Sequence, residues 1–223
     1  MSKQKNEKYK GALKMKKEKI LSKPLCMTLL ICAFVYGLIL PFCWGNNPLE
    51  PNGTLSLLCE TRKAFFWVWA LMTGLSSVLN VQYMYHKLGS KKKYLDVLNV
   101  LAFISIITIA LTLGHSINDW NPKRLAHWIA TGGYIVFLVA SRLLYFLSNI
   151  KRQKLFAVLS ACIAAILALF LVLFAVIGKS GVMEIVPNAL LQIMLFVVNF
   201  TPAAKTKEST SAVTQKAKAD AVQ

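Results

Sequence analysis

Four residues near the ends of long apolar runs have side chains that could do chemistry together. His115 and Asp119 lie in a polar stretch between two such runs, and His127 opens the second of them. Glu184 lies near the start of the last run. Imidazole and carboxylate groups can bind a divalent metal such as zinc, with His115 and His127 as its candidate ligands, or they can form an acid–base pair.

The same stretch is also typical of a polar hairpin between two membrane helices. Its spacing matches no named metal motif. In this alternative Asp119 caps a turn, Trp120 and Trp128 lie at the membrane interface, and Lys123 and Arg124 meet lipid phosphate. We favour the hairpin and expect no cofactor, with a divalent metal as the alternative.

The segments that position these residues have the length of membrane spans. The chain of 223 residues is 56% apolar, and its apolar residues fall in runs of about 20, the number that a helix needs to cross a bilayer. Backbone groups in lipid must be satisfied within a helix or a closed barrel, and barrel strands would be shorter and alternating. The sequence therefore predicts an all-α, polytopic transmembrane helix bundle with six spans, at residues 25–43, 64–85, 95–114, 127–148, 155–178 and 182–200.

The basic residues gather on one side of the predicted membrane. The net charge is +17, and 20 of the 26 lysines and arginines fall in residues 1–23, in the second and fourth links, or in the tail. This bias predicts that both termini are cytoplasmic. We interpret the charge as topology and attraction to anionic lipid, not as nucleic-acid binding. Residues 1–24 are predicted to be a disordered leader that is not a cleavable signal peptide, 25–200 the transmembrane domain, and 201–223 a disordered tail.

The first exterior loop carries two sites of covalent modification. Cys43 ends the first span and Cys59 lies in the loop, so the two could form a disulfide in an oxidising compartment or remain free thiols. Asn52 begins an Asn-Gly-Thr sequon on the side where glycosylation takes place.

Polar residues recur at helical spacing on four of the six spans. They are Thr73, Ser77 and Asn80 on the second; Ser105, Thr108, Thr112 and His115 on the third; His127, Thr131, Tyr134, Ser141, Arg142 and Tyr145 on the fourth; and Glu184, Asn188, Gln192 and Asn199 on the sixth. Polar stripes in lipid face protein or water. We therefore expect spans two, three, four and six to surround a polar interior, with spans one and five outside.

The stripes suggest a pocket that opens at the exterior face. Its candidate residues are His115, Asp119, His127, Glu184, Thr131, Tyr134 and Asn188. The plainer interpretation of most of these side chains is interhelical hydrogen bonding. Arg142 could either snorkel to phosphate or pair with Asp96 or His86 near the cytoplasmic end.

Short motifs along the chain resemble those of the DRAM-like family, the relatives of the damage-regulated autophagy modulator. They are the Pro-Leu-Glu-Pro element that includes Glu50, the aromatic start of the second span at Phe65, Phe66 and Trp67, and the Arg-Leu-Ala-His opening of the fourth span. The resemblance covers residues 25–200. It implies a six-span membrane protein connected with lipid organisation or trafficking, without established catalytic residues, and His127 and Glu50 match recurring positions of the pattern.

Two classes of function remain. The first is a non-enzymatic membrane protein that binds or organises lipid or a protein partner through the polar pocket. The second is an intramembrane enzyme or transporter that uses the His/Asp/Glu cluster. No nucleophile elbow, phosphate-binding glycine loop or Cys-x-x-Cys motif is present in the sequence, so we favour the first class.

Overall fold

The computed structural model describes residues 22–50, 53–60, 62–89, 92–113, 121–178 and 180–204. All regular secondary structure in these ranges is helical. The elements are α2 (Lys23–Ile39), η1 (Leu40–Gly45), α3 (Leu55–Leu58), α4 (Lys63–Leu88), α5 (Lys93–Leu111), α6 (Pro122–Ser148), α7 (Lys154–Ile177) and α8 (Gly181–Phe200). Six helical segments, α2 with η1, α4, α5, α6, α7 and α8, are long and apolar enough to cross a membrane. The protein is therefore an integral, multi-pass membrane protein, as the sequence predicts.

The observed helix ends agree closely with the predicted spans except at the start of α6. This helix begins at Pro122, not at His127, so Lys123 and Arg124 lie in its first turn. Asn121 is the N-cap, and its side chain accepts a hydrogen bond from the backbone N–H of Arg124 at 2.9 Å. Proline at the first helical position has a fixed φ and no N–H to leave unsatisfied. The capping signal was therefore in the sequence, two residues after Asp119.

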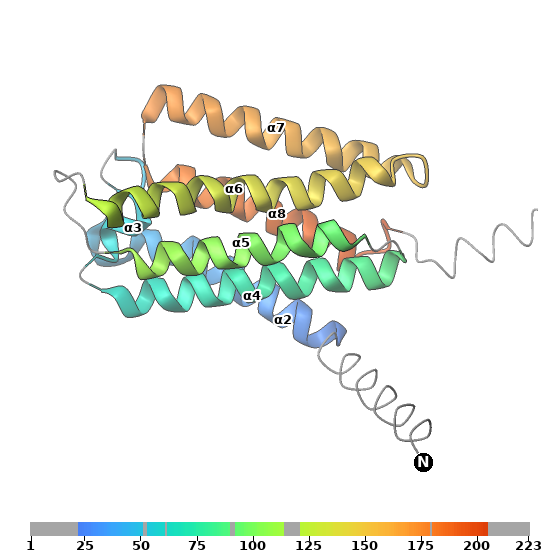
Figure 1. Cartoon of the computed structure of the whole chain (residues 1–223), viewed down its shortest axis with the longest axis horizontal. Helices are drawn as coiled ribbons and strands as arrows, with labels where there is room; N and C mark the ends of the chain where they lie inside the picture. The colour runs from blue at the N-terminus through green and yellow to red at the C-terminus, as the bar shows by residue number, and fades with distance from the viewer. Residues whose placement is uncertain are drawn as a thin grey trace, which may run out of the picture.

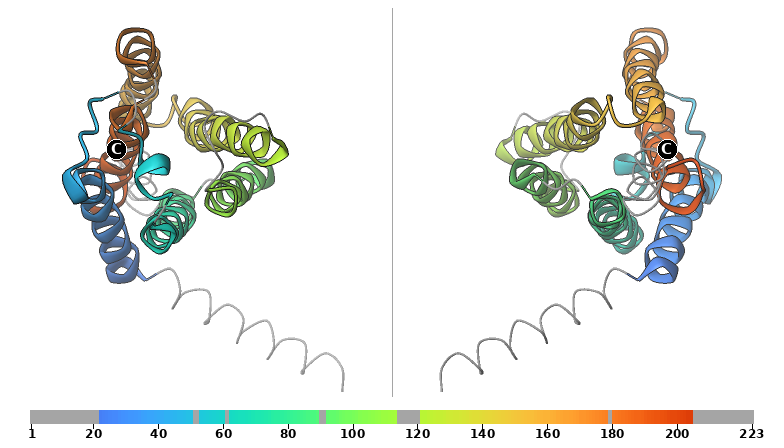
Figure 2. Two further views of the ribbon diagram at one scale, coloured as in Figure 1. Left: turned by 90° about the vertical axis from the view of Figure 1, so that its left-hand side faces the viewer. Right: turned by 90° about the vertical axis from the view of Figure 1, so that its right-hand side faces the viewer.

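The six long helices form a ring in which each packs against the next. The packed pairs in order around the ring are α2/α4, α4/α5, α5/α6, α6/α7, α7/α8 and α8/α2, and α4 also packs against α8. Figure 1 shows the helices running along one axis, with α7 diverging from α6 toward the end where α3 lies. The end views in Figure 2 show α3 inside the ring, between α8 and α4. The short helix therefore lies over one end of the bundle interior.

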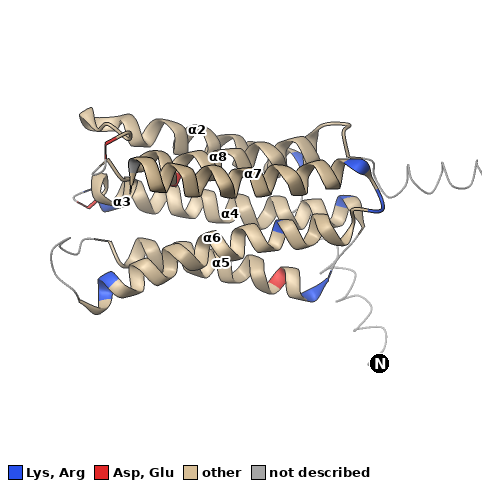
Figure 3. Ribbon diagram, turned by 90° about the horizontal axis from the view of Figure 1, so that it is seen from above, with Lys and Arg blue, Asp and Glu red and all other residues tan. Residues whose placement is uncertain are grey.

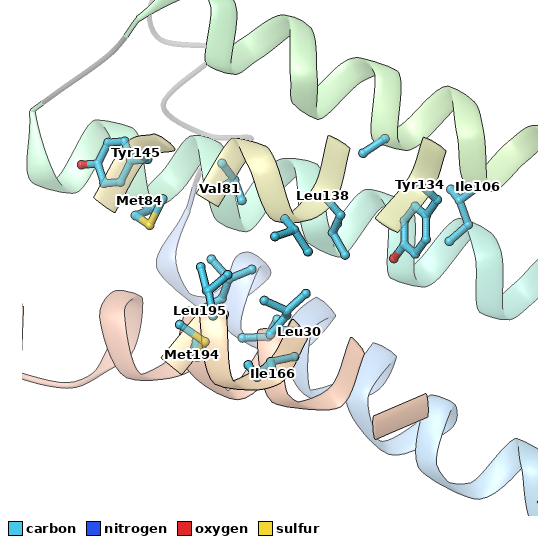
Figure 4. Close-up of a cluster of buried hydrophobic side chains, with 14 of the residues drawn as sticks. Leu30, Val81, Met84, Ile106, Tyr134, Leu138, Tyr145, Ile166, Met194 and Leu195 are labelled. Carbon is cyan, nitrogen blue, oxygen red and sulfur yellow. The ribbon is translucent and has the colours of Figure 1, made fainter. Parts of the chain in front are cut away.

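Charged residues lie mostly at the two ends of this bundle, as Figure 3 shows. The end where α2 starts and α8 finishes carries Lys23, Lys87, Lys92, Lys93, Lys151, Arg152 and Lys154. The α3 end carries Arg62, Lys63, Lys123 and Arg124, together with Glu50, Glu60 and Glu184. Between the ends, apolar side chains of different helices meet in the interior, including Leu138 of α6 and Leu195 of α8 (Figure 4). The segment between the charged ends has the composition of a bilayer-spanning region.

Candidate functional site

A cavity of about 350 Å³ lies in the ring at the α3 end. Its walls come from α3, α4, α5, α6, α7 and α8, while α2 contributes no lining residue. Most of the lining is apolar, with Leu138, Ile166 and Leu191 at the deeper end. The volume lies within the usual range for small-molecule pockets, roughly 300–1,000 Å³. The exclusion of the first span agrees with the prediction.

Five of the predicted pocket residues line this cavity. His127, Thr131 and Tyr134 come from α6, and Glu184 and Asn188 come from α8. Their spacings, three or four residues apart, place them on one face of each helix, which is the signal that predicted them. The other two predicted residues, His115 and Asp119, lie outside the described residues.

Two of the hydrogen bonds made by polar groups of the cavity are long. The hydroxyl of Tyr134 donates to Oδ1 of Asn188 at 3.4 Å, linking α6 to α8 across the cavity. The Thr112 hydroxyl lies 3.2 Å from Nδ1 of His127. Both distances lie beyond the usual optimum of about 2.8 Å for hydroxyl donors. These contacts orient the side chains, and a ligand with suitable groups could compete for them.

Helix α3 covers one end of the cavity and is tied to Glu184. The backbone N–H of Leu55 donates to Oε2 of Glu184 at 2.6 Å, and the hydroxyl of Ser56 donates to Oε1 at 3.5 Å. Thr54 caps the helix by accepting from the N–H of Leu57 at 3.3 Å. The charge-assisted bond from the Leu55 N–H to Glu184, at 2.6 Å, is among the strong ones. Helix α3 was not among the predicted elements, although Thr54 before an apolar run was a local signal for a helix start.

The cavity has a lateral opening between α6 and α7, onto the outer surface of the helix bundle. Trp128 of α6 and Leu171 of α7 both line the cavity, yet they are 48% and 65% exposed. Figure 1 shows the two helices separating toward this end. Since these helices cross the membrane, the opening faces lipid.

The prediction that span five lies outside the polar interior is wrong, because α7 forms one wall of the cavity. Its lining residues are Ile166, Leu167, Phe170, Leu171 and Phe174. The cavity wall and the lipid-facing surface are both apolar. A polar stripe therefore could not mark this wall, and hydropathy does not distinguish the two faces.

Cys43 and Cys59 are free thiols in the structure, so the disulfide considered from the sequence is not formed there. Cys59 is fully buried beneath the α3 segment, and Sγ of Cys43 donates to the carbonyl of Ile39 at 3.6 Å. Burial raises the pKa of Cys59 to about 11, and the charges of Glu184 and Cys43 contribute to the rise. At neutral pH the Cys59 side chain is therefore a protonated, apolar part of the closure around α3.

The metal and glycosylation predictions can be compared with only part of the chain. Within the described ranges, no three His, Cys, Asp or Glu side chains are grouped so as to hold a metal ion. His127 is described, but His115, its predicted partner ligand, is not. Asn52 of the sequon also lies outside the described residues.

Arg142 follows neither of the two alternatives drawn from the sequence. Its side chain is 2% exposed, so it does not snorkel to the membrane surface. Asp96, one expected partner, instead accepts a hydrogen bond from Nε2 of Gln82 at 2.5 Å. The other expected partner, His86, is exposed. The hydrogen bonds of Arg142 go to the carbonyl of Leu138 and the hydroxyl of Ser77.

Comparison with protein-family models, curated proteins and solved structures finds no match for this chain. The resemblance to the DRAM-like family therefore stays a prediction from the motifs quoted above.

Proposed function

We propose that the protein binds a lipid-like amphiphile in the cavity enclosed by α3 and helices α4 to α8. One observation carries this proposal: a mostly apolar cavity, with polar groups at its α3 end, opens between two membrane helices. A molecule with a polar head and an apolar chain matches this arrangement of surfaces.

The depth of the cavity corresponds to one leaflet of a bilayer. Along α6, its lining runs from His127 to Val139. This segment rises about 18 Å at 1.5 Å per residue, roughly half of a 30 Å hydrocarbon core. His127, Thr131, Tyr134 and Glu184 would meet the head group, and Leu138, Ile166 and Leu191 would meet the end of the chain. The volume is at the small end for ligand pockets, which favours a single chain over a whole phospholipid.

The opening between α6 and α7 gives a route for such a ligand from the membrane. Trp128 and Leu171 present apolar surface both to the cavity and to the surroundings. A chain moving past them would stay in contact with apolar groups throughout, so it would not need to enter water. Entry from the exterior solution is hindered by α3, which Glu184 holds in place.

The test is photochemical labelling of the protein in vesicles with a fatty acid that carries a diazirine. We expect saturable labelling of α6 and α7 peptides that unlabelled fatty acid suppresses. Ile135 lines the cavity, so Ile135→Trp places a large ring in it and should lower the saturable labelling several-fold. Val136→Trp is the matched control, since Val136 is the adjacent residue, is 61% exposed and does not line the cavity.

Labelling that does not saturate, or that is equal in the two tryptophan variants, would show that the fatty acid meets only the outer surface of the helices. That result would contradict the proposal. Size-exclusion chromatography of both variants establishes that they are folded before labelling is compared.

We further propose that the α3 end faces the exterior and that both chain termini face the cytoplasm. The cations at the α2 start and the α8 end support this orientation under the positive-inside rule. A C-terminal reporter that is active only in the cytoplasm provides the test. The membership in the DRAM-like family that the motifs suggest is compatible with a lipid-binding role and stays a proposal of the same kind.

A further inference from the structure

The guanidinium of Arg142 is a positive charge buried between α4 and α6. Nη1 donates to the carbonyl of Leu138 at 2.7 Å, and Nη2 donates to the hydroxyl of Ser77 at 2.8 Å. Both acceptors are neutral. Nε is buried without a hydrogen-bond partner in the described part of the chain. A cation inside a membrane protein is costly unless it is paired, so this site calls for a negative charge.

None of the four described carboxylates forms an ion pair with Arg142. Glu50, Glu60 and Glu184 belong to the α3 end, and Asp96 accepts from Gln82. The neighbours that interact electrostatically with the guanidinium are the hydroxyls of Tyr134 and Tyr85. The described residues around Arg142 therefore supply polarity but no compensating charge.

A further hydrogen-bond donor, the hydroxyl of Tyr85, lies beside this charge. It is one of the two tyrosine hydroxyls that interact electrostatically with the guanidinium. It is buried and has no hydrogen-bond partner among the described residues. A buried hydroxyl without a partner costs stability, and an anion can accept from a phenol and a guanidinium at once.

The site lies next to the cavity but is distinct from it. Because Nη1 reaches back to the carbonyl of Leu138, the guanidinium points along α6 toward the deep end of the cavity. Leu138 lines that end, whereas Arg142 itself is not a lining residue.

We propose that Arg142, with the hydroxyl of Tyr85, binds one exchangeable small inorganic anion such as chloride. This inference does not rest on the proposed function.

The experiment measures the unfolding temperature of the purified full-length protein in neutral detergent at constant ionic strength. Sodium gluconate is replaced stepwise by sodium chloride. We expect a saturable rise of the unfolding temperature with chloride concentration. Arg142→Gln should abolish this rise. Arg152→Gln is the control: it removes the same charge from an exposed arginine, and the rise should remain.

Tyr85→Phe gives a second test that does not depend on the folding of Arg142→Gln. It keeps the charge and removes one donor, so the half-saturating chloride concentration should rise about tenfold. An unfolding temperature of the wild type that chloride does not change would overturn the proposal. An equal response in wild type, Arg142→Gln and Tyr85→Phe would do the same.

The chloride response and the fatty-acid labelling separate this inference from the proposed function. A chloride response without saturable labelling of the cavity supports the anion site and contradicts the lipid site. Saturable labelling without a chloride response supports the lipid site and contradicts the anion site.

Discussion

Two groups of buried polar side chains in the bundle differ in how firmly they are bonded. On the α2–α4–α8 side, Nδ2 of Asn80 donates to the carbonyls of Cys26 and Ser76, each at 3.0 Å. Nδ2 of Asn199 donates to the carbonyl of Asn80 at 2.9 Å. In the cavity, the Tyr134–Asn188 bond is 3.4 Å long and joins two side chains.

This difference separates a structural role from a binding role. Asn80 is fully buried and its bonds end on backbone groups that cannot move away, so it holds three helices together. Tyr134 and Asn188, by contrast, are joined through two rotatable side chains beside an opening, so a ligand can replace their contact. Polar residues in a span therefore have to be judged by their partners, since helical spacing is the same in both groups.

The largest expected effect concerns the closed end of the cavity. Because the pKa of Cys59 is about 11 instead of 9.0, its reactive thiolate is about a hundredfold rarer at pH 8 than in the unfolded chain. Alkylation of Cys59 by iodoacetamide, followed by peptide mass spectrometry, should be about a hundredfold slower in the folded protein and should speed up as the pH rises toward 11. Reaction at the unfolded rate would mean that α3 does not close this end.

The next largest effect is expected on the firmly bonded side. Asn80→Leu keeps the volume of the side chain but removes its amide, and should lower the free energy of unfolding by about 2–3 kcal/mol. Thr108→Val is the control, because the Thr108 hydroxyl bonds only to the Ile104 carbonyl of its own helix. That variant should change stability by less than about 0.5 kcal/mol. Equal losses of unfolding free energy in the two variants, measured by thermal unfolding, would contradict the structural role of Asn80.

A smaller, local effect is expected where α3 is anchored. Glu184→Gln replaces the charged acceptor of the Leu55 N–H by a neutral one, and should weaken the local closure by about 1–1.5 kcal/mol. Hydrogen exchange of the α3 amides should then become about tenfold faster. Glu60→Gln is the control. The Glu60 carboxylate lies in the same segment, but no hydrogen bond from it to α3 is described, so the exchange should stay unchanged. Unaltered exchange in Glu184→Gln would show that other contacts hold the helix.

The smallest effect on stability is expected for the loosely bonded cavity pair. Tyr134→Phe removes the 3.4 Å bond to Asn188 and should cost less than about 1 kcal/mol in thermal unfolding. Saturable fatty-acid labelling should nevertheless fall several-fold, because a head-group contact is lost. A loss of stability like that of Asn80→Leu, with labelling retained, would place Tyr134 in the structural group.

Much of the fold could be predicted from the sequence because membrane helices leave a strong local signal. Six apolar runs predicted the six spans, and spacing of three or four residues brought His127, Thr131 and Tyr134 to one face. The same rule placed Glu184 and Asn188 together on α8. These inferences need only residues that are neighbours along one helix.

The features that were missed depend on residues far apart in the chain. The anchoring of α3 depends on Glu184, which lies 129 residues after Leu55. The α7 wall was missed because apolar residues face both a cavity and lipid. The neutral surroundings of Arg142 come from Ser77 and Tyr85 of another helix, so a partner chosen by membrane depth, such as Asp96, was wrong.

Native mass spectrometry of the protein released from gentle detergent tests the central claim most directly. The account predicts that wild type and Val136→Trp retain an amphiphile of defined mass, and that Ile135→Trp, with its cavity filled, is released without it. Wild-type protein that carries no amphiphile, or an adduct equally abundant in both tryptophan variants, would contradict the claim that the cavity is a lipid site.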